Sequence, residues 1–214
     1  MPRLVDHEQR RAEIGAAAVR VILRRGLDGV TIRGIAAETG WSTGSLRHYF
    51  PDQDALRGHA AAVVTRTLRE RVHPRLSRPR DADSVVDGVA AIVEEFLPLD
   101  DVRREEYALW SAVVAWERGH LLEGGSTIWK DQRALYRQCV AVLLGHEPVH
   151  GIIPEAFRPH DDPAVETGAA LLHTFVDGLA SQILNTPGEV TPAHSADLLR
   201  EFLHVLTTPT SRGS

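Results

Sequence analysis

A single residue, Trp41, separates the expected end of one short helix at Gly40 from the expected start of the next at Ser42. Thr31 and Ser42 are suited to begin helices because an N-cap side-chain oxygen accepts a hydrogen bond from a free amide group of the first turn. Gly40 is suited to end a helix because glycine adopts the left-handed conformation there without a steric penalty. Two short helices joined by so tight a turn, and preceded by a longer helix, are typical of a three-helix helix-turn-helix domain.

Apolar residues recur three and four positions apart along most of the chain, which predicts helices throughout. The one β-like run, Val30 to Ile32, is too short for a strand and is interpreted as the entry to a helix. The stretch from Arg71 to Asp83, which includes Pro74, is the expected linker, and Gly145 to Asp162 is an expected loop. The fold class is therefore predicted to be all-α, with about nine helices: Asp6 to Gly26, Thr31 to Gly40, Ser42 to Tyr49, Asp52 to Val72, Asp83 to Leu97, Asp101 to Arg118, Ser126 to Leu144, Pro163 to Asn185 and Pro192 to Leu206.

Positive charge is concentrated at the start of the chain. Residues 1 to 80 contain 15 Arg and no Lys against 8 Asp plus Glu, a net charge of +7, whereas the remaining residues carry a net charge of −12. A basic first third on an acidic remainder indicates that the first part meets a polyanion such as nucleic acid. A solvated basic face without a partner would give the same distribution of charge.

The composition also bears on the compartment. No run reaches the roughly 18 consecutive apolar residues of a membrane span, and the N-terminal residues lack the apolar stretch of a signal peptide. The one cysteine, Cys139, permits no disulfide within the chain and no thiolate cluster for zinc. We therefore expect a cytoplasmic protein that makes no membrane contact, and the near absence of Lys, with only Lys130, indicates a bacterial source with a GC-rich genome.

The segment Gly26 to Leu56 closely resembles the N-terminal domain of the tetracycline-repressor (TetR) family of transcriptional regulators. Eleven residues match the family pattern at fixed spacing, which is far more specific than a lone short motif. They are Gly29, Thr31, Ile35, Ala36, Gly40, Ser42, Gly44, Leu46, Tyr49, Phe50 and Leu56. The resemblance implies a helix-turn-helix DNA-binding domain over residues 1–52 and a helical ligand-binding and dimerisation domain over residues 53–214.

The third helix is the expected DNA-reading element. Leu46 and Phe50 are four positions apart and form its inward face, so the remaining side chains point outward. Where many family members have Tyr after the Leu, this chain has Arg47, whose guanidinium can reach a guanine edge or a phosphate; Gln53 replaces a common Lys. Thr31 and Ser42 would cap helices in any protein, and Tyr49 is as consistent with the core as with DNA contact. The expected DNA-binding residues are Thr31, Arg33, Ser42, Thr43, Gly44, Ser45, Arg47, His48, Tyr49 and Gln53.

The last two predicted helices resemble those that form a four-helix bundle between two subunits in the family. The first of them is apolar on more than one face, and such a helix must be covered on several sides. A dimer also fits the reading of DNA, because two recognition helices must enter successive major grooves roughly 34 to 36 Å apart. The expected interface consists of Leu172, Val176, Ile183, Leu198, Phe202 and Leu206.

Aromatic and polar residues of the middle helices are candidates for a small-molecule cavity, since ligand pockets combine apolar walls with a few polar groups. The candidates are Phe96, Trp110, Trp116, His120, Trp129, His173 and Asp177. Each of them also suits an ordinary core. In the family, ligand binding changes the separation of the recognition helices and weakens DNA binding, which requires the ligand to prefer the conformation that does not bind DNA.

The sequence thus predicts a sequence-specific DNA-binding regulator, a homodimeric repressor released from double-stranded operator DNA by a small-molecule effector. A regulator that binds DNA without any effector is an alternative. A helical enzyme is a third reading, but the chain has no nucleophile motif, no metal-binding histidine motif and no phosphate-binding glycine loop. We therefore assign no catalytic residues, no metal ligands and no cofactor apart from the effector.

Overall fold

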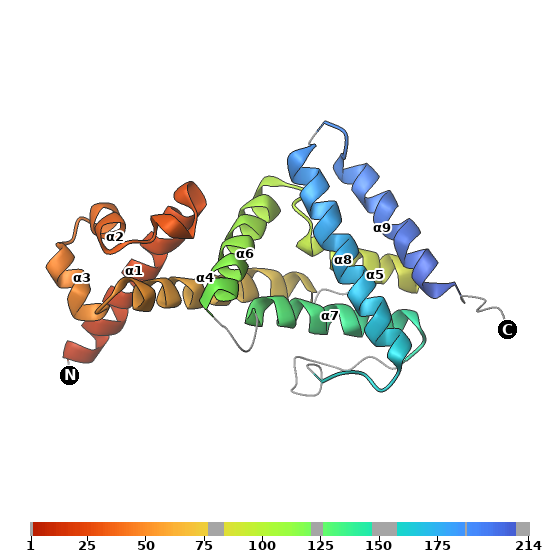
Figure 1. Ribbon diagram of the computed structural model, residues 1–214, viewed down its shortest axis with the longest axis horizontal. Helices are drawn as coiled ribbons and strands as arrows, with labels where there is room; N and C mark the ends of the chain where they lie inside the picture. Colours follow the sequence, from red (N-terminus) through yellow and green to blue (C-terminus); the bar gives the residue numbers. More distant parts are fainter. Residues whose placement is uncertain (1, 77–83, 121–125, 147–157, 187, 209–214) are drawn as a thin grey trace. The chain divides into compact units, whose positions relative to one another are not determined.

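The helix-turn-helix is present in the computed structural model of the chain (Figure 1), which describes residues 2–76, 84–120, 126–146, 158–186 and 188–208. Helix α1 spans Pro2–Arg25, α2 Ile32–Thr39 and α3 Thr43–Tyr49, with a 3-10 turn, η1, at Leu27–Gly29. The Thr31 hydroxyl accepts a hydrogen bond from the Gly34 amide at 2.9 Å, and the Ser42 hydroxyl accepts one from the Ser45 amide at 3.0 Å. Gly40 ends α2 in the left-handed conformation with φ 74°. The predicted caps of this motif are confirmed.

Apolar side chains from α1 to α4 (Gln53–Leu76) make up the core of the motif. Leu46 of α3 and Leu56 of α4 are completely buried, and Phe50 between them is 2% exposed. Helices α1 and α4 approach closely at Gly15, where a Cβ atom would lie 2.9 Å from a methyl carbon of Val63. This packing fixes α3 against the two longer helices and leaves its other face uncovered.

The remaining elements are also helical. They are α5 Val85–Val93, a 3-10 turn η2 at Glu94–Phe96, α6 Asp101–His120, α7 Thr127–Leu143, α8 Pro163–Asn185 and α9 Pro192–Thr207. The described residues contain no strand, which confirms the all-α prediction. None of their helices is long and apolar enough to cross a membrane.

Some predicted boundaries were wrong. Helix α1 begins at Pro2 rather than Asp6, and α4 continues through Pro74 to Leu76, inside the expected linker. A proline removes one backbone donor and disfavours a helix interior, but Pro74 lies only two residues before the end of α4. Residues 77–83 of the expected linker and 147–157 of the expected loop lie outside the described residues.

Contacts divide the chain into two compact units. The first comprises residues 1–73 and 108–128, and the second comprises residues 74–107 and 129–214. Helix α6 therefore contributes its first residues to the second unit and its last thirteen, from Ala108 to His120, to the first. The division of function after residue 52 remains a prediction.

The second unit has its own apolar core, to which α5, α7, α8 and α9 contribute. Helix α8 supplies Leu172 and Val176, which are 0% and 1% exposed, and α9 supplies Leu199 and Leu203, both completely buried. Helices α8 and α9 lie side by side (Figure 1). Helices α7 and α8 approach so closely that a Cβ at Gly168 would lie 2.6 Å from a methyl carbon of Val140.

Candidate nucleic-acid interface and ligand site

The uncovered face of α3 is polar, with short side chains at its start. Thr43, Ser45, Arg47 and His48 are all exposed, while Leu46 on the opposite face is completely buried. The periodicity of the helix produces this separation, because residues three and four apart share a face. The face predicted to read DNA is thus available at the surface.

Arg33 of α2 and Arg47 of α3 are exposed and make no hydrogen bond or ion pair with any described residue. Some other cations of the first unit are engaged. Arg57 donates hydrogen bonds to the carbonyl oxygens of Val30, at 3.2 Å, and Asp28, at 3.4 Å, and so ties α4 to the segment before α2. Arg33 and Arg47 can therefore turn their donors to a phosphate or a base edge without losing a contact within the protein.

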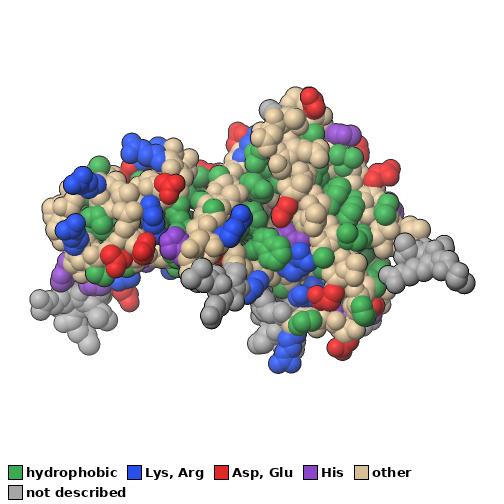
Figure 2. Space-filling model, viewed as in Figure 1, with side chains coloured by type: hydrophobic (Ala, Val, Ile, Leu, Met, Phe, Trp, Pro, Cys, Tyr) green, Lys and Arg blue, Asp and Glu red, His purple; other side chains and the backbone are tan. Residues whose placement is uncertain are grey.

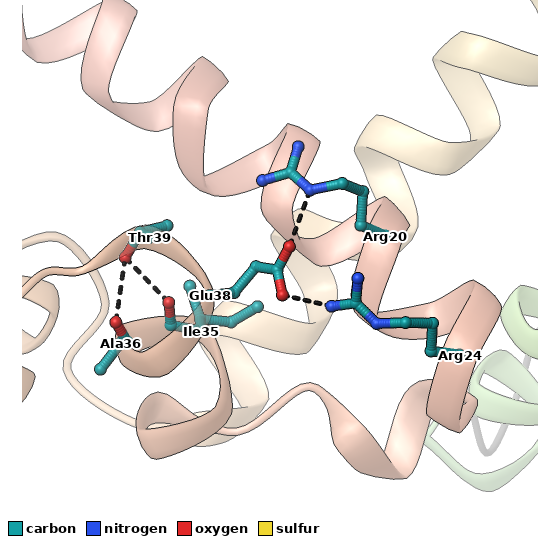
Figure 3. Close-up of polar contacts among 6 residues, drawn as sticks. All are labelled: Arg20, Arg24, Ile35, Ala36, Glu38 and Thr39. Atoms are coloured by element: carbon teal, nitrogen blue, oxygen red, sulfur yellow. Dashed lines mark hydrogen bonds and ion pairs between the residues drawn. The ribbon is translucent and has the colours of Figure 1, made fainter.

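Glu38 of α2 is held between two arginines of α1 (Figure 3). Arg20 Nε donates to Glu38 Oε1 at 2.8 Å, and Arg24 Nη2 donates to Oε2. The hydrogen bonds from Arg20 and then Arg24 lower the pKa of the Glu38 carboxyl group below its ordinary value. This pairing anchors α2 on α1 and neutralises part of the positive charge of α1. The sequence analysis did not identify it, because the partners are 14 and 18 positions apart.

The hydroxyl groups of Thr31 and Ser42 act as N-caps, as described above, and can also serve DNA. Each oxygen accepts from an amide of its own helix, which leaves the hydroxyl hydrogen available for donation. The Ser42 and Ser45 oxygens are 2.8 Å apart, so one of these hydroxyl groups donates to the other. The capping role and the proposed phosphate contact are therefore compatible at Thr31.

Tyr49 packs at the edge of α3 and is only half-buried. Its ring centroid lies 4.8 Å from that of His7 and 5.9 Å from that of Trp41. The Arg10 guanidinium lies over the Trp41 ring, 4.8 Å from its centroid, at a distance typical of a cation–π contact. Gln53, at the start of α4, is exposed. Tyr49 thus has a packing role, while Gln53 is accessible.

Gly44 provides a test of close DNA approach, because nothing within the protein requires a glycine there. A Cβ at Gly44 would meet no atom closer than Ser42 Oγ at 3.8 Å. Gly44→Ala should therefore stabilise the protein by about 0.5 kcal/mol, since alanine loses less backbone entropy on folding. If the backbone meets a sugar or phosphate, the same change should weaken operator binding by about tenfold, or 1.4 kcal/mol. Urea unfolding and fluorescence anisotropy measure the two effects.

The matched control is Gly119→Ala on α6, where an added Cβ also meets nothing within 4 Å. It should raise stability in the same way and leave DNA affinity unchanged. Unchanged affinity in Gly44→Ala as well would exclude close approach at Gly44.

The seven ligand candidates fall into two sets. Trp110, Trp116 and His120 belong to the first unit, where the Trp116 and His120 rings stack with centroids 4.9 Å apart. Phe96, Trp129, His173 and Asp177 belong to the second unit.

The candidates of the second unit form a group centred on one of them, His173, which is completely buried. The Trp129 ring stacks on the His173 ring with centroids 4.2 Å apart, and the Tyr136 ring meets it edge-on at 5.1 Å. Phe96 contacts Tyr136 in turn, at 5.9 Å. Arg133, Tyr136 and Gln132 are also part of this cluster, although the sequence-based list did not include them. Gln132, Arg133 and Tyr136 follow Trp129 by three, four and seven positions. This spacing places the four residues on one face of α7 and was the signal in the sequence that could have identified them.

Polar contacts define the state of the His173 ring. Arg133 Nε donates to His173 Nδ1 at 3.0 Å, so Nδ1 carries no hydrogen. Burial, and next the charge of Arg133, lower the pKa of His173 to about 4. The ring is therefore neutral at pH 7, with its hydrogen on Nε2. Asp177 Oδ1 lies 3.8 Å from Nε2, beyond hydrogen-bond distance.

His173 should make the protein less stable in mild acid. The unfolded chain binds a proton at this histidine below the ordinary pKa of 6.5, whereas the folded chain does so only near 4, so the free energy of unfolding falls as the pH drops between these values. At pH 5 the expected cost is about 2 kcal/mol, from 1.36 kcal/mol per pKa unit. Urea unfolding at pH 7.5 and pH 5 should therefore show a smaller loss for His173→Phe than for the original chain.

The control for this experiment is His194→Phe, which replaces an exposed histidine of α9. Its pH dependence should match that of the original chain. Equal pH dependence in His173→Phe and the original chain would mean that His173 is protonated in the folded state.

The residues expected at a subunit interface lie in two different environments. Leu172, Val176 and Ile183 are at most 3% exposed and fill the core of the protomer itself, so a second chain cannot reach them. Leu198, Phe202 and Leu206 of α9 are partly exposed. The sequence analysis assigned the wrong face of α8, because that helix is apolar on several sides and its pattern alone does not say which side faces the partner.

The outward face of α8 and α9 is apolar as well. Leu171 is 49% exposed and Val205 is 67% exposed. Between them the Phe175 and Phe202 rings stack with centroids 4.1 Å apart. Figure 2 shows hydrophobic side chains gathered over α8 and α9 on the face toward the viewer. We call Leu171, Phe175, Phe202 and Val205 the apolar face.

A capped helix-turn-helix with an exposed cationic third helix, followed by a helical body, defines the class of helix-turn-helix transcriptional regulators. The family described as "Bacterial regulatory proteins, tetR family" matches residues 14–60, and "BetI-type transcriptional repressor, C-terminal" matches residues 85–208. The chain belongs to the TetR family of transcriptional regulators.

Individual relatives agree with this assignment. The chain is 37% identical over 121 residues to the HTH-type transcriptional regulator PksA of Bacillus subtilis (strain 168), covering 55% of this chain and 56% of the relative. It is 33% identical over 113 residues to the HTH-type transcriptional regulator BetI of Burkholderia lata, covering 52% of this chain and 58% of the relative. The chain thus spans little more than half the length of these curated relatives.

Solved structures share the fold along nearly the whole chain. A transcriptional regulator from Rhodococcus sp. Rha1 has a TM-score of 0.65 at 26% identity, covering 92% of this chain and 95% of its own. A putative transcriptional regulator from Saccharomonospora viridis, solved in complex with choline, has a TM-score of 0.66 at 22% identity, covering 92% of this chain and 96% of its own.

Proposed function

We propose that the protein is a homodimeric repressor that binds operator DNA through α3 and releases it when a small molecule binds the second unit. The observation that carries the DNA-binding part is the exposed face of α3, where Arg47 has no competing partner among the described residues. Such an arginine can donate two hydrogen bonds to O6 and N7 of a guanine. Thr31 and Arg33, at the start of α2, are proposed to hold the adjacent phosphates.

The apolar face supports the homodimer. Isolated exposed hydrophobic residues are common in monomers, but contiguous apolar patches mark interaction sites. The stacked rings of Phe175 and Phe202, flanked by Leu171 and Val205, form such a patch on α8 and α9, two neighbouring helices of the second unit. A twofold interface pairs the same patch on both subunits, and a dimer supplies the two copies of α3 that two half-sites require.

The cluster around His173 supports an effector site, because it combines three aromatic rings with polar groups inside the second unit. The proposal covers Phe96, Trp129, His173 and Asp177 of the original candidates. Trp110, Trp116 and His120 are placed in the first unit and are not included.

Footprinting on the DNA beside the gene for this protein tests the function directly. We expect a protected, twofold-symmetric site of two half-sites and loss of protection when the correct metabolite is added. Protection that no metabolite from the neighbouring pathway alters would favour the regulator without an effector. Failure to protect or shift any such DNA, together with turnover of a metabolite, would favour the enzyme.

A further inference from the structure

Six side chains from two helices of the second unit form one polar and aromatic cluster. Trp129, Gln132, Arg133 and Tyr136 lie on one face of α7, and His173 and Asp177 of α8 face them. Direct contacts connect five members: Trp129 stacks on His173, Tyr136 meets its edge, Arg133 donates to its Nδ1, and the Gln132 amide donates to the Tyr136 hydroxyl at 2.7 Å. The sixth member, Asp177, lies with Oδ1 3.8 Å from His173 Nε2. We call these six residues the His173 cluster.

Two buried polar atoms of the His173 cluster have no hydrogen-bond partner among the described residues. They are His173 Nε2 and Gln132 Oε1. His173 is completely buried and Gln132 is 8% exposed, so bulk water does not compensate them. Each buried polar group without a partner costs about 1 to 3 kcal/mol, so a bound molecule that supplied the partner would gain affinity.

Arg133 is the second unusual feature of the cluster. It makes no ion pair with any described residue, whereas Arg137, one turn later on α7, is paired with Glu166 through two hydrogen bonds. Burial, and next the neighbouring charge of Arg137, lower the pKa of Arg133. Within the described part of the chain, Nε is its only donor with a hydrogen-bond acceptor, which is His173 Nδ1. The cluster therefore holds a half-buried positive charge on which the carboxylates of Asp177 and Glu166 act without forming an ion pair within 4 Å.

These groups discriminate between classes of ligand. A ligand cation would compete with Arg133, whose guanidinium already lies over the Trp129 ring at 4.9 Å from its centroid. The neutral His173 ring presents a hydrogen-bond donor at Nε2, not an acceptor. A carboxylate matches both features, because its two oxygens accept from a guanidinium and from a neighbouring N–H at once.

We infer that the His173 cluster binds a small organic acid, whose carboxylate accepts hydrogen bonds from the Arg133 guanidinium and from His173 Nε2. This inference rests on the proposed effector-responsive function and names the chemical class of the effector. Trp129 and Phe96 provide apolar surface for the body of the acid, and the Gln132 amide is available to one further polar group. The Asp177 carboxyl group borders the site with Oδ1 3.8 Å from His173 Nε2, and burial raises its pKa, which lessens its repulsion of a ligand carboxylate.

Calorimetric titration of the full chain with matched probes tests the inference. The probes are benzoate and octanoate, the corresponding uncharged amides, and choline. We expect each carboxylate to bind at least tenfold more tightly than its amide, and choline to bind more weakly than either carboxylate. Arg133→Gln should remove the preference for the carboxylate, and Arg133→Lys should retain part of it because the charge remains.

Arg118→Gln is the matched control, since Arg118 is exposed on the part of α6 that belongs to the first unit. It should bind the probes as the original chain does. Circular dichroism and operator binding without probe check that Arg133→Gln is folded. His173→Phe, which removes the Nε2 donor and keeps an aromatic ring, should weaken both carboxylates about tenfold and leave the amides nearly unaffected.

Three results would overturn the inference: no binding of either carboxylate, equal affinity for acids and amides, or unchanged carboxylate affinity in Arg133→Gln. Each of these leaves the proposed function intact if another compound, such as choline, releases the protein from its operator. Failure of the proposed function has a different signature, in which the carboxylates bind and require Arg133 but the footprint on DNA does not change.

Discussion

Val205→Arg is expected to convert the dimer into monomers and to weaken operator binding by about a hundredfold or more, because the gain from joining two half-site contacts is lost. Val205 is the most exposed residue of the apolar face, at 67%, so its replacement does not disturb the core of the protomer. In a twofold interface the arginine would meet the same face of the partner, where a charge in an apolar contact is strongly unfavourable. Sedimentation velocity measures the assembly, and anisotropy measures the affinity.

Val102→Arg is the matched control, because Val102 is another exposed valine of the second unit, at 56%, and lies on α6 outside the apolar face. It should remain dimeric and bind DNA normally. A dimer that persists in Val205→Arg would contradict the assignment of this face. Phe202→Asp is a harsher version of the experiment, since it also removes the ring that stacks on Phe175.

Arg47→Ala is expected to weaken operator binding by about 1 to 3 kcal/mol, roughly fivefold to over a hundredfold. The side chain is exposed and has no partner among the described residues, so its loss should leave the stability of the fold unchanged. If Arg47 reads a base, the variant should lose preference for the operator over scrambled DNA. If it contacts only phosphate, affinity for both should fall equally and the salt dependence should become shallower by about one counterion.

Arg66→Ala serves as the comparison for Arg47→Ala. Arg66 is exposed on α4 and pairs with Glu70 at 3.9 Å, one turn away. It should affect DNA binding little. Equal affinity of Arg47→Ala and the original chain for the operator would remove Arg47 from the interface.

Local signals in the sequence were sufficient to predict the DNA-binding motif. Thr31, Gly40 and Ser42 act over three or four residues, through hydrogen bonds to their own helices, and these caps fix where α2 and α3 begin and end. The burial of Leu46 followed in the same way from its spacing to Phe50. Such features need no knowledge of the tertiary structure.

The face of α8 could not be predicted in this way. Leu171 and Leu172 are adjacent and chemically identical, yet one is 49% exposed and the other completely buried. The sequence shows only that α8 is apolar on several sides, and the packing of α7 and α9 decides which side is covered. The contact between Arg133 and His173, 40 positions apart, likewise depends on the packing of α7 on α8.

The pairing of Glu38 with Arg20 and Arg24 has a consequence for how the protein searches a genome. Nonspecific attraction to a duplex grows with the number of counterions that free cations displace from it. The 15 arginines among residues 1–80 overstate that number, since Glu38 pairs with Arg20 and Arg24 and cancels one of their two positive charges before any nucleic acid arrives. Binding to nonspecific DNA is therefore weaker, and the few hydrogen-bond donors that face the bases provide a larger share of the free energy of operator binding.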